Sequence, residues 1–179
     1  MQYIRPATPA DVSAITAIYR HHVLTGTASF EEEPPSEADM ANRLAAILER
    51  HLPYLCLETA DPATGRRRIA GYAYAGPYRP RSAYRFTVED SIYVAPDATG
   101  RGHGRALLER LIADCRALKL REIIAVIGDS ANSASIGLHR QAGFRDVGTL
   151  RQVGFKFGRW LDSVLMQLSL QDTDTQPDE

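Results

Sequence analysis

The stretch SIYVAPDATGRGHGRALLERL, residues 91–111, largely determines which fold the sequence predicts. It reads as the end of a strand, a turn containing Gly100, Gly102 and Gly104, and then directly a strong amphipathic helix. Glycine lets a backbone approach a ligand closely, and the first turn of a helix carries amide groups without partners inside the helix. With the helix dipole, these amides favour a pyrophosphate group. A tight turn that binds nothing is the alternative interpretation.

The spacing of these glycines excludes two common phosphate-binding motifs. A Walker loop requires lysine and then serine or threonine after its last glycine, whereas Arg105 and Ala106 follow Gly104. A dinucleotide-binding fingerprint has glycine at its first, third and sixth positions, and Arg105 stands at the sixth. Arg101 and Arg105 instead add positive charge beside the turn.

Several segments then resemble one family. TGRGHGRALL (99–108) is similar to the coenzyme A loop of GNAT superfamily acetyltransferases, although Thr99 replaces the usual Gln or Arg, and NSASIGLHRQAGF (132–144) resembles the family's Asn-containing turn and helix. The resemblance narrows to the phosphinothricin and methionine sulfoximine N-acetyltransferase branch, and it covers about residues 2–170. The segments that narrow it are AYAGPYRPRSAY (73–84), VEDSIYV (88–94), AVIGDSANSASIGLH (125–139) and GFKFGRWLD (154–162).

Periodicity and turn residues predict the elements of the fold. Thr8, Pro9 and Asp11 indicate a helix start, and Ser36 with Asp39 indicates another. The resemblance implies an α/β (α+β) GNAT fold with a mixed, mostly antiparallel sheet of about seven strands and about four helices. Strands are expected at 2–6, 52–59, 68–78, 85–94, 122–127, 144–153 and 156–168, and later helices at 36–50, 102–118 and 132–143.

Composition limits the class of protein. With 179 residues, 44% of them hydrophobic, the chain can form one domain with a full core, expected over 1–170, before an acidic tail (171–179) expected to be disordered. A net charge of −1 favours neither nucleic acid nor a membrane as partner. The N-terminus shows no signal pattern, which predicts a cytoplasmic protein. Cys56 and Cys115 lie in apolar patterns and are expected to be buried thiols.

The resemblance implies acetyl-coenzyme A as cosubstrate. Its diphosphate is expected on the backbone amides of residues 100–105, and its pantetheine arm along the strand that ends near Val94, whose amide is a candidate donor to the oxyanion. No metal is predicted, because the histidines lack a ligand arrangement. The cofactor-binding residues predicted in this way are Tyr93, Val94, Gly100, Arg101, Gly102, His103, Gly104, Arg105, Asn132 and Ser135.

Two side chains are predicted to be catalytic. Strand alternation places Glu89, Ser91 and Tyr93 on one face, and the resemblance implies that Glu89 is the general base. Asp90 faces the other way and offers a comparison. His139 stands near the position where many GNAT enzymes protonate the thiolate, and histidine titrates near neutral pH. The alternatives are a solvated strand glutamate and a structural histidine.

A third group is predicted to bind the acceptor substrate. Arg79, Arg81 and Tyr84 precede the catalytic strand, and guanidinium groups suit a carboxylate or phosphinate. Phe30 resembles the branch's aromatic residue on the loop that covers the substrate. A solvated basic loop and a core phenylalanine are the alternatives.

The expected function is transfer of acetyl from acetyl-coenzyme A to the amino group of phosphinothricin, methionine sulfoximine or a related amino acid, by direct attack. The resemblance also implies a homodimer. Acetylation of a protein or peptide, or a non-catalytic sensor that binds coenzyme A, are the alternatives.

Overall fold

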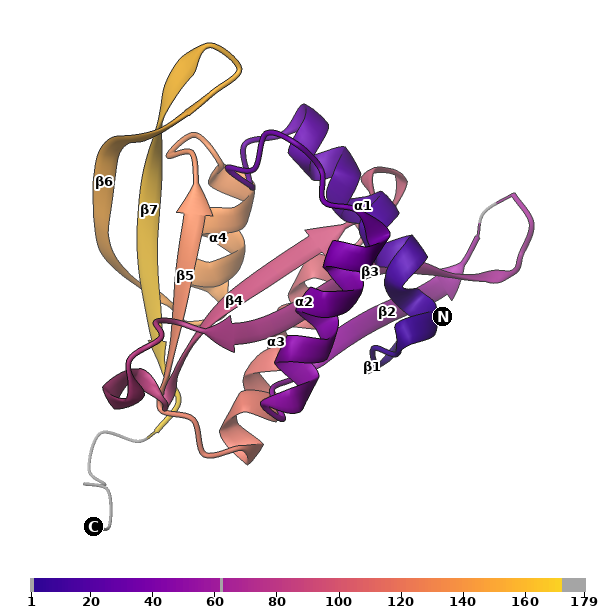
Figure 1. Cartoon of the computed structure of the whole chain (residues 1–179), viewed down its shortest axis with the longest axis horizontal. Coiled ribbons are helices and arrows are strands. Elements are labelled where there is room, and N and C mark those ends of the chain that lie inside the picture. The colour runs from indigo at the N-terminus through magenta and orange to yellow at the C-terminus, as the bar shows by residue number, and fades with distance from the viewer. Residues whose placement is uncertain (1, 62, 172–179) are drawn as a thin grey trace.

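The computed structural model of the chain describes residues 2–61 and 63–171 and has seven strands in one sheet (Figure 1). The spatial order is β1-β2-β3-β4-β5-β7-β6, and every neighbouring pair is antiparallel except β4 and β5. This confirms the mixed, mostly antiparallel sheet. The strands are β1 (Tyr3–Pro6), β2 (Tyr54–Ala60), β3 (Arg67–Pro77), β4 (Thr87–Val94), β5 (Glu122–Gly128), β6 (Arg145–Lys156) and β7 (Arg159–Ser169).

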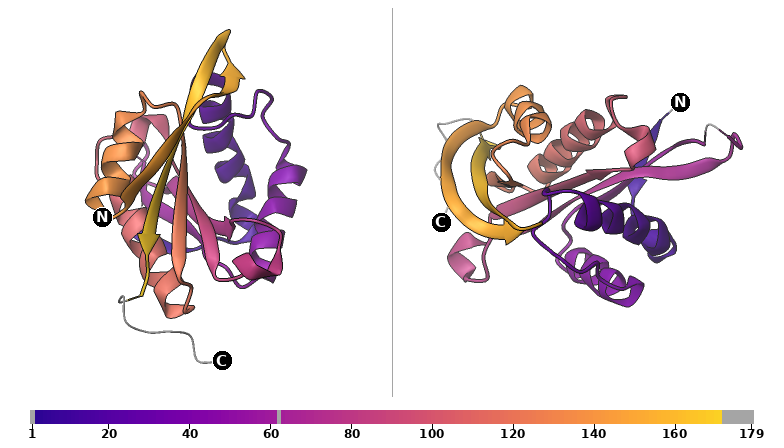
Figure 2. Two further views of the ribbon diagram at one scale, coloured as in Figure 1. Left: turned by 90° about the vertical axis from the view of Figure 1, so that its left-hand side faces the viewer. Right: turned by 90° about the horizontal axis from the view of Figure 1, so that it is seen from above.

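Four α-helices in the described ranges cover the sheet, two on each face (Figure 2). Helices α1 (Val12–Thr25) and α2 (Glu37–Glu49) pack on one face, and α3 (His103–Ala117) and α4 (Ser133–Gln141) on the other. The amphipathic pattern of α3 is confirmed, because its apolar face is buried against the sheet. Both cysteines are buried and unpaired, as expected.

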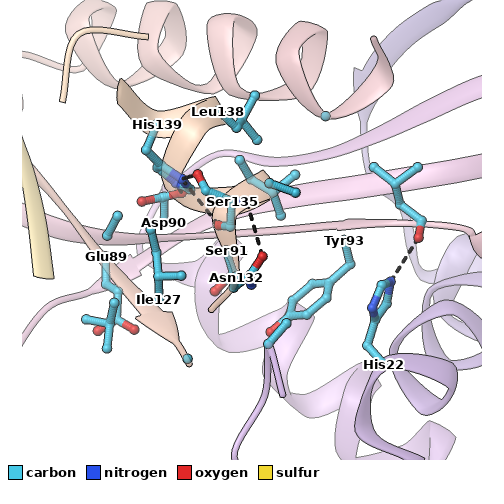
Figure 3. Close-up of a pocket in the computed structure, with 18 of the residues that line it drawn as sticks. His22, Glu89, Asp90, Ser91, Tyr93, Ile127, Asn132, Ser135, Leu138 and His139 are labelled. Carbon is cyan, nitrogen blue, oxygen red and sulfur yellow. Dashed lines mark hydrogen bonds and ion pairs between the residues drawn. The ribbon is translucent and has the colours of Figure 1, made fainter. Parts of the chain in front are cut away.

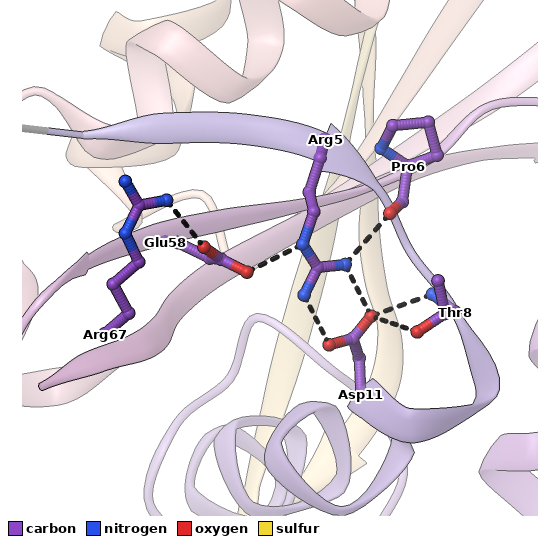
Figure 4. Close-up of polar contacts among 6 residues, drawn as sticks. All are labelled: Arg5, Pro6, Thr8, Asp11, Glu58 and Arg67. Carbon is purple, nitrogen blue, oxygen red and sulfur yellow. Dashed lines mark hydrogen bonds and ion pairs between the residues drawn. The ribbon is translucent and has the colours of Figure 1, made fainter.

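The predicted helix starts are confirmed by the hydrogen bonds that form them. The backbone amide and hydroxyl of Thr8 donate to Asp11 Oδ2, at 2.8 and 2.9 Å, and the Arg5 guanidinium binds both oxygens of Asp11 at 2.7 Å (Figure 4). Arg5 Nε also reaches Glu58 Oε1 of β2 at 2.6 Å. The start of α1 is thereby fixed to the sheet, after a short 3-10 turn at Pro9–Asp11. Ser36 and Asp39 form the equivalent capping box at α2.

The feature of the sheet that matters most is the separation of β4 from β5. Their parallel pairing covers three positions, Thr87 with Glu122, Val88 with Ile123 and Glu89 with Ile124. Beyond Glu89 the two strands continue without pairing to each other along their described lengths. A wedge-shaped gap therefore opens in the middle of the sheet.

The closing hairpin differs from the sequence prediction. The turn was expected near residues 154–155, but β6 continues to Lys156 and the chain reverses at Phe157 and Gly158, which both have positive φ. This conformation matches the two-residue turn that suits hairpin twist. The pairing of β6 with β7 shifts register between Leu150 and Gly154. This shift interrupts the regular alternation of side chains between the two faces of β6. The predicted disordered tail lies outside the described residues, except for Gln171.

Candidate active site

A pocket of about 520 Å³ occupies the gap between β4 and β5 (Figure 3). This volume is in the range of small-ligand sites. Its walls come from residues 89–94 of β4, residues 125–128 of β5, helix α4 with its N-cap Asn132, and the loop between α1 and α2. Further lining residues are His22, Gly104 and Ser163.

Beyond Glu89, the backbone of β4 presents groups to this pocket that do not pair with β5. The Ala95 amide bonds the Ala70 carbonyl at 2.8 Å and fixes the phase of the ladder between β3 and β4. Because antiparallel hydrogen bonds alternate, the backbone groups of Ile92 and Val94 point away from β3, toward the gap. The Val94 carbonyl accepts a hydrogen bond from His22 Nε2 at 2.8 Å. The same alternation directs the Val94 amide toward the gap.

His22 is a pocket residue that the sequence interpretation missed. It contacts the Tyr93 ring at 5.4 Å between centroids, and burial lowers the pKa of its imidazole. The signal was present, because His22 follows Ile15 and Tyr19 at helical spacing on the buried face of α1.

The glycine turn before α3 has the shape that a diphosphate requires. Gly100 and Gly102 have φ of 72° and 80°, and the space where a Cβ would stand is open at both. The first helical hydrogen bond runs from the Ala106 amide to the Gly102 carbonyl, so the amides of residues 103–105 precede the helical ladder. A Cβ on Gly104 would contact Leu138 and Val94 only at ordinary distances. The cradle therefore fits a ligand held by backbone amides.

The side chains of this turn differ in the partners they have. Arg101 is exposed, and Arg105 Nε bonds Glu109 Oε1 at 2.7 Å, so part of its charge is already compensated. The buried His103 ring donates to Gln2 Oε1 at 2.9 Å and lies beside the N-terminal segment. The backbone amide of His103 is one of those that precede the helical ladder.

A chain of hydrogen bonds connects α4 to β4. Asn132 caps α4 by accepting from the Ser135 amide at 3.2 Å, and the Ser135 carbonyl accepts from His139 Nδ1 at 2.8 Å. His139 Nε2 lies 2.9 Å from Asp90 Oδ2. Burial opposes the charge on His139, but the bond and charge of Asp90, with the Ser135 carbonyl, outweigh it and raise the histidine's pKa.

This chain changes the interpretation of two residues. Asp90 does face away from Glu89, as alternation predicts, but it is bonded to His139 and so is unsuitable as an inert comparison. Asp90 Oδ1 is buried without a hydrogen-bond partner in the described part of the chain. Both ring nitrogens of His139 are occupied, so a proton transfer would have to break one of these bonds. The predicted acid or base role of His139 remains a prediction that this geometry disfavours.

Glu89 is the carboxylate placed to accept a proton in the pocket. Its side chain hangs from the opposite face of β4 to Asp90, close to the point where β4 and β5 part (Figure 3). Burial, followed by the charge of Asp90, raises the pKa of Glu89, and the charge of Arg79 partly opposes this. A base with a raised pKa accepts a proton more readily than an ordinary glutamate.

Comparison with known proteins identifies the fold. Residues 15–144 match the model of the acetyltransferase (GNAT) family. The chain belongs to that family. It is 55% identical to a phosphinothricin N-acetyltransferase of Alcaligenes faecalis, over 96% of this chain and 84% of that protein. It is 44% identical to an L-methionine sulfoximine/L-methionine sulfone acetyltransferase of Pseudomonas aeruginosa, over 97% and 98% of the two chains.

A solved structure matches this GNAT chain equally well. The phosphinothricin acetyltransferase of Sinorhizobium meliloti, crystallised with acetyl-coenzyme A, superposes with a TM-score of 0.92 at 47% identity. The match covers 99% of this chain and 94% of that one. The predicted GNAT fold is confirmed.

The acceptor residues predicted for this GNAT protein fall into two groups. Phe30 lines the pocket, whereas Arg79, Arg81 and Tyr84 are exposed and are not among the described lining residues. The loop that carries these three exposed residues precedes the start of β4, whereas β4 lines the pocket only from Glu89 onward. Arg79 acts on the site through its charge, which opposes the rise in the pKa of Glu89.

Two further properties of the GNAT chain concern metals and membranes. Among the residues the structure describes, no three His, Cys, Asp or Glu side chains are grouped to hold a metal ion. None of the described helices is long and apolar enough to cross a membrane.

Proposed function

We propose that this GNAT protein transfers acetyl from acetyl-coenzyme A to the amino group of a small amino-acid-like substrate, of the phosphinothricin, methionine sulfoximine or methionine sulfone type. The observation that carries the proposal is the position of Glu89. Its half-buried carboxylate enters the pocket on the strand that also supplies the inward-facing Val94 amide. The names of the relatives supply the substrate class.

Cosubstrate binding in this proposal relies on the backbone. The amides of residues 103–105 hold the diphosphate, and the unpaired edge of β4 binds the pantetheine arm beside Asn132 and Ser135. The Val94 amide donates to the thioester carbonyl oxygen, where negative charge develops as the amine attacks. His22 binds the Val94 carbonyl and so helps to fix the end of β4 that carries this amide.

The chemical step needs a neutral amine, and Glu89 provides it. The carboxylate takes one proton from the substrate ammonium, and the neutral amine attacks the thioester carbonyl directly. As the C–S bond breaks, the departing thiolate takes up the second proton of the nitrogen, which leaves the acetamide and the free thiol of coenzyme A, and Glu89 then releases its proton to solvent. Tyr93 stays protonated at neutral pH, because burial raises the pKa of its hydroxyl well above its usual range. The Asp90–His139 pair holds α4 in place and transfers no proton.

The proposed assembly is a homodimer in the cytoplasm. The hairpin of β6 and β7 exposes a row of large apolar side chains, a pattern typical of a surface that another chain covers. The free cysteines of the chain, Cys56 and Cys115, suit a reducing compartment such as the cytoplasm. Residues 1–170 act as one catalytic domain in this proposal. The exposed apolar residues of the hairpin are Val147, Leu150, Val153, Phe155, Phe157 and Trp160.

Thiol release from acetyl-coenzyme A tests the substrate class. The panel contains phosphinothricin, methionine sulfoximine, methionine sulfone, ordinary amino acids, polyamines and peptides. We expect selective turnover of the first three. Turnover restricted to peptides would support a peptide acetyltransferase, and binding of acetyl-coenzyme A without turnover of any amine would support a sensor; either result contradicts the proposal.

A further inference from the structure

Lys156, which no step of the proposed reaction uses, is buried at the end of β6. Its side chain is 2% exposed, while its neighbours Phe155 and Phe157 are 53% and 56% exposed. Lys156 Nζ donates to the carbonyl oxygens of Gly26 and Ser29, at 2.9 and 2.7 Å. Both carbonyls belong to the loop between α1 and α2.

The same loop carries Phe30 into the pocket. The Phe30 ring lies directly against Gly154 of β6 and Gly128 of β5. A Cβ on Gly154 would overlap the ring, and one on Gly128 would lie 2.8 Å from Phe30 Cε1. The ring therefore fits only because β5 and β6, which lie on either side of β7, both carry glycine at these points.

A second contact ties the loop to the other side of the hairpin turn. Asp129 Oδ2 accepts from Thr27 Oγ1 at 3.2 Å and from the Arg159 guanidinium at 2.6 Å. On its inner side, Ser29 Oγ lies 2.8 Å from the hydroxyl of Tyr19 in α1. Residues 26–30 are thus held from the hairpin and from the helix at once.

We propose that Lys156 is a positioning residue that sets the acceptor specificity of the pocket. Its ammonium holds the carbonyls of residues 26 and 29 on β6, and this keeps Phe30 across the end of the pocket that receives the amine. An ammonium has three donors and can serve both carbonyls, which an apolar side chain would leave buried without a partner. The inference rests on the proposed function, because it assumes that the acceptor lies beneath Phe30.

The kinetic test uses Lys156→Met, with Lys119→Met as the matched control. These are the two lysines of the chain, and Lys119 is exposed. We expect the KM for methionine sulfone to rise about tenfold in Lys156→Met, which corresponds to part of the free energy of the two charge-assisted hydrogen bonds that are lost, with acetyl-coenzyme A affinity unchanged. The preference for methionine sulfone over a methionine dipeptide should fall by a similar factor. Loss of folded enzyme alone would leave both the KM and this preference unchanged.

Gly154→Ala provides a second route to the same displacement, with Lys156 intact. It should raise the acceptor KM in the same way, and combining it with Lys156→Met should add little, because both changes free the same loop. Fully additive effects would overturn the proposal. An unchanged acceptor KM in both variants, in an enzyme whose wild type turns over methionine sulfone, would also overturn it.

Amine labelling supplies a readout that does not depend on turnover. With an N-hydroxysuccinimide ester and mass spectrometry, Lys119 should react readily and Lys156 slowly. Methionine sulfone with coenzyme A should slow Lys156 further and leave Lys119 unaffected. Equal labelling of Lys156 with and without methionine sulfone would refute the proposed role of Lys156 in acceptor specificity. A wild type that turns over no member of the amine panel would instead refute the proposed function, and the acceptor role with it.

Discussion

His139 Nε2 lies 2.9 Å from Asp90 Oδ2, with both side chains almost completely buried. Because Nδ1 donates to the Ser135 carbonyl, a hydrogen on Nε2 as well makes the ring an imidazolium. The two residues are 49 positions apart and join β4 to α4, so the pair determines how the walls of the pocket stand relative to each other.

Asp90→Asn is expected to destabilise the fold by about 3 kcal/mol, because it leaves a buried cation without its partner. Urea unfolding at neutral pH measures the difference. Asp146→Asn is the control, since its pair with Arg140 is exposed, and it should leave the unfolding midpoint unchanged. Equal effects of the two substitutions would show that the buried pair has no special weight.

The stability contribution of His139 should depend on pH in a defined direction. Its pKa is raised in the folded state above the ordinary value of 6.5. The contribution is therefore fully present below about pH 6.5 and lost as the pH rises through the folded pKa. Relative to His139→Gln, the wild type should lose stability as the pH rises from about 6.5 through the folded pKa of His139. A constant difference across the same interval would contradict a charged His139.

Glu89→Gln should lower kcat about 100-fold or more, with acetyl-coenzyme A binding retained. In the wild type, the acid limb of kcat/KM should lie above pH 4.5, because the pKa of Glu89 is raised by burial and by Asp90.

Arg79→Ala removes a charge that opposes the rise in the pKa of Glu89, so the acid limb of kcat/KM should move to higher pH, most visibly at low salt. Arg85→Ala is the control, since Arg85 stacks on Phe86; a limb that moves equally in both variants would exclude a specific effect of Arg79.

Gly102→Ala should weaken acetyl-coenzyme A binding about tenfold, because a methyl group enters the cradle and the positive φ becomes strained by about 1 kcal/mol. Gly65→Ala is matched to it: φ is 68° there, the surroundings are equally open, and the site is distant in the β2–β3 turn. Calorimetry on both variants separates strain from ligand contact. Equal dissociation constants would argue against diphosphate binding at this turn.

Trp160→Glu should convert the proposed dimer to a monomer in analytical ultracentrifugation. Trp160 is 62% exposed and packs edge-on against Phe155, 5.1 Å between ring centroids, on the apolar hairpin. Leu118→Glu places the same charge on an exposed apolar residue at the end of α3 and should leave the assembly unchanged. A wild type that sediments as a monomer would refute the assembly.

Local patterns predicted most of the fold, because they depend on neighbouring residues. The Ser36–Asp39 capping box and the separation of Glu89 from Asp90 across the two faces of β4 both follow from spacing. The end of β6 differs from the prediction, since the strand expected to end at Val153 continues to Lys156 and the turn begins at Phe157.

The site was less predictable because its contacts connect distant segments. Nothing near Asp90 in the sequence indicates His139, and nothing near Lys156 indicates the carbonyls of Gly26 and Ser29. The basic loop before β4 was predicted to bind the acceptor because guanidinium groups suit a carboxylate or phosphinate; Arg79, Arg81 and Tyr84 are exposed beside the start of β4, and their role stays a prediction.

The separation of β4 from β5 also limits how far this protein can be stabilised. After Glu89 the two strands, over the lengths that the structure describes, form no hydrogen bonds to each other, so the sheet lacks the stability that those bonds would add. The pocket occupies the space between the separated strands. Selection for heat resistance alone would favour variants in which β4 and β5 pair along their whole length. Such variants would resist melting and have no cavity, so thermostability screens of this enzyme should retain a turnover assay at every round.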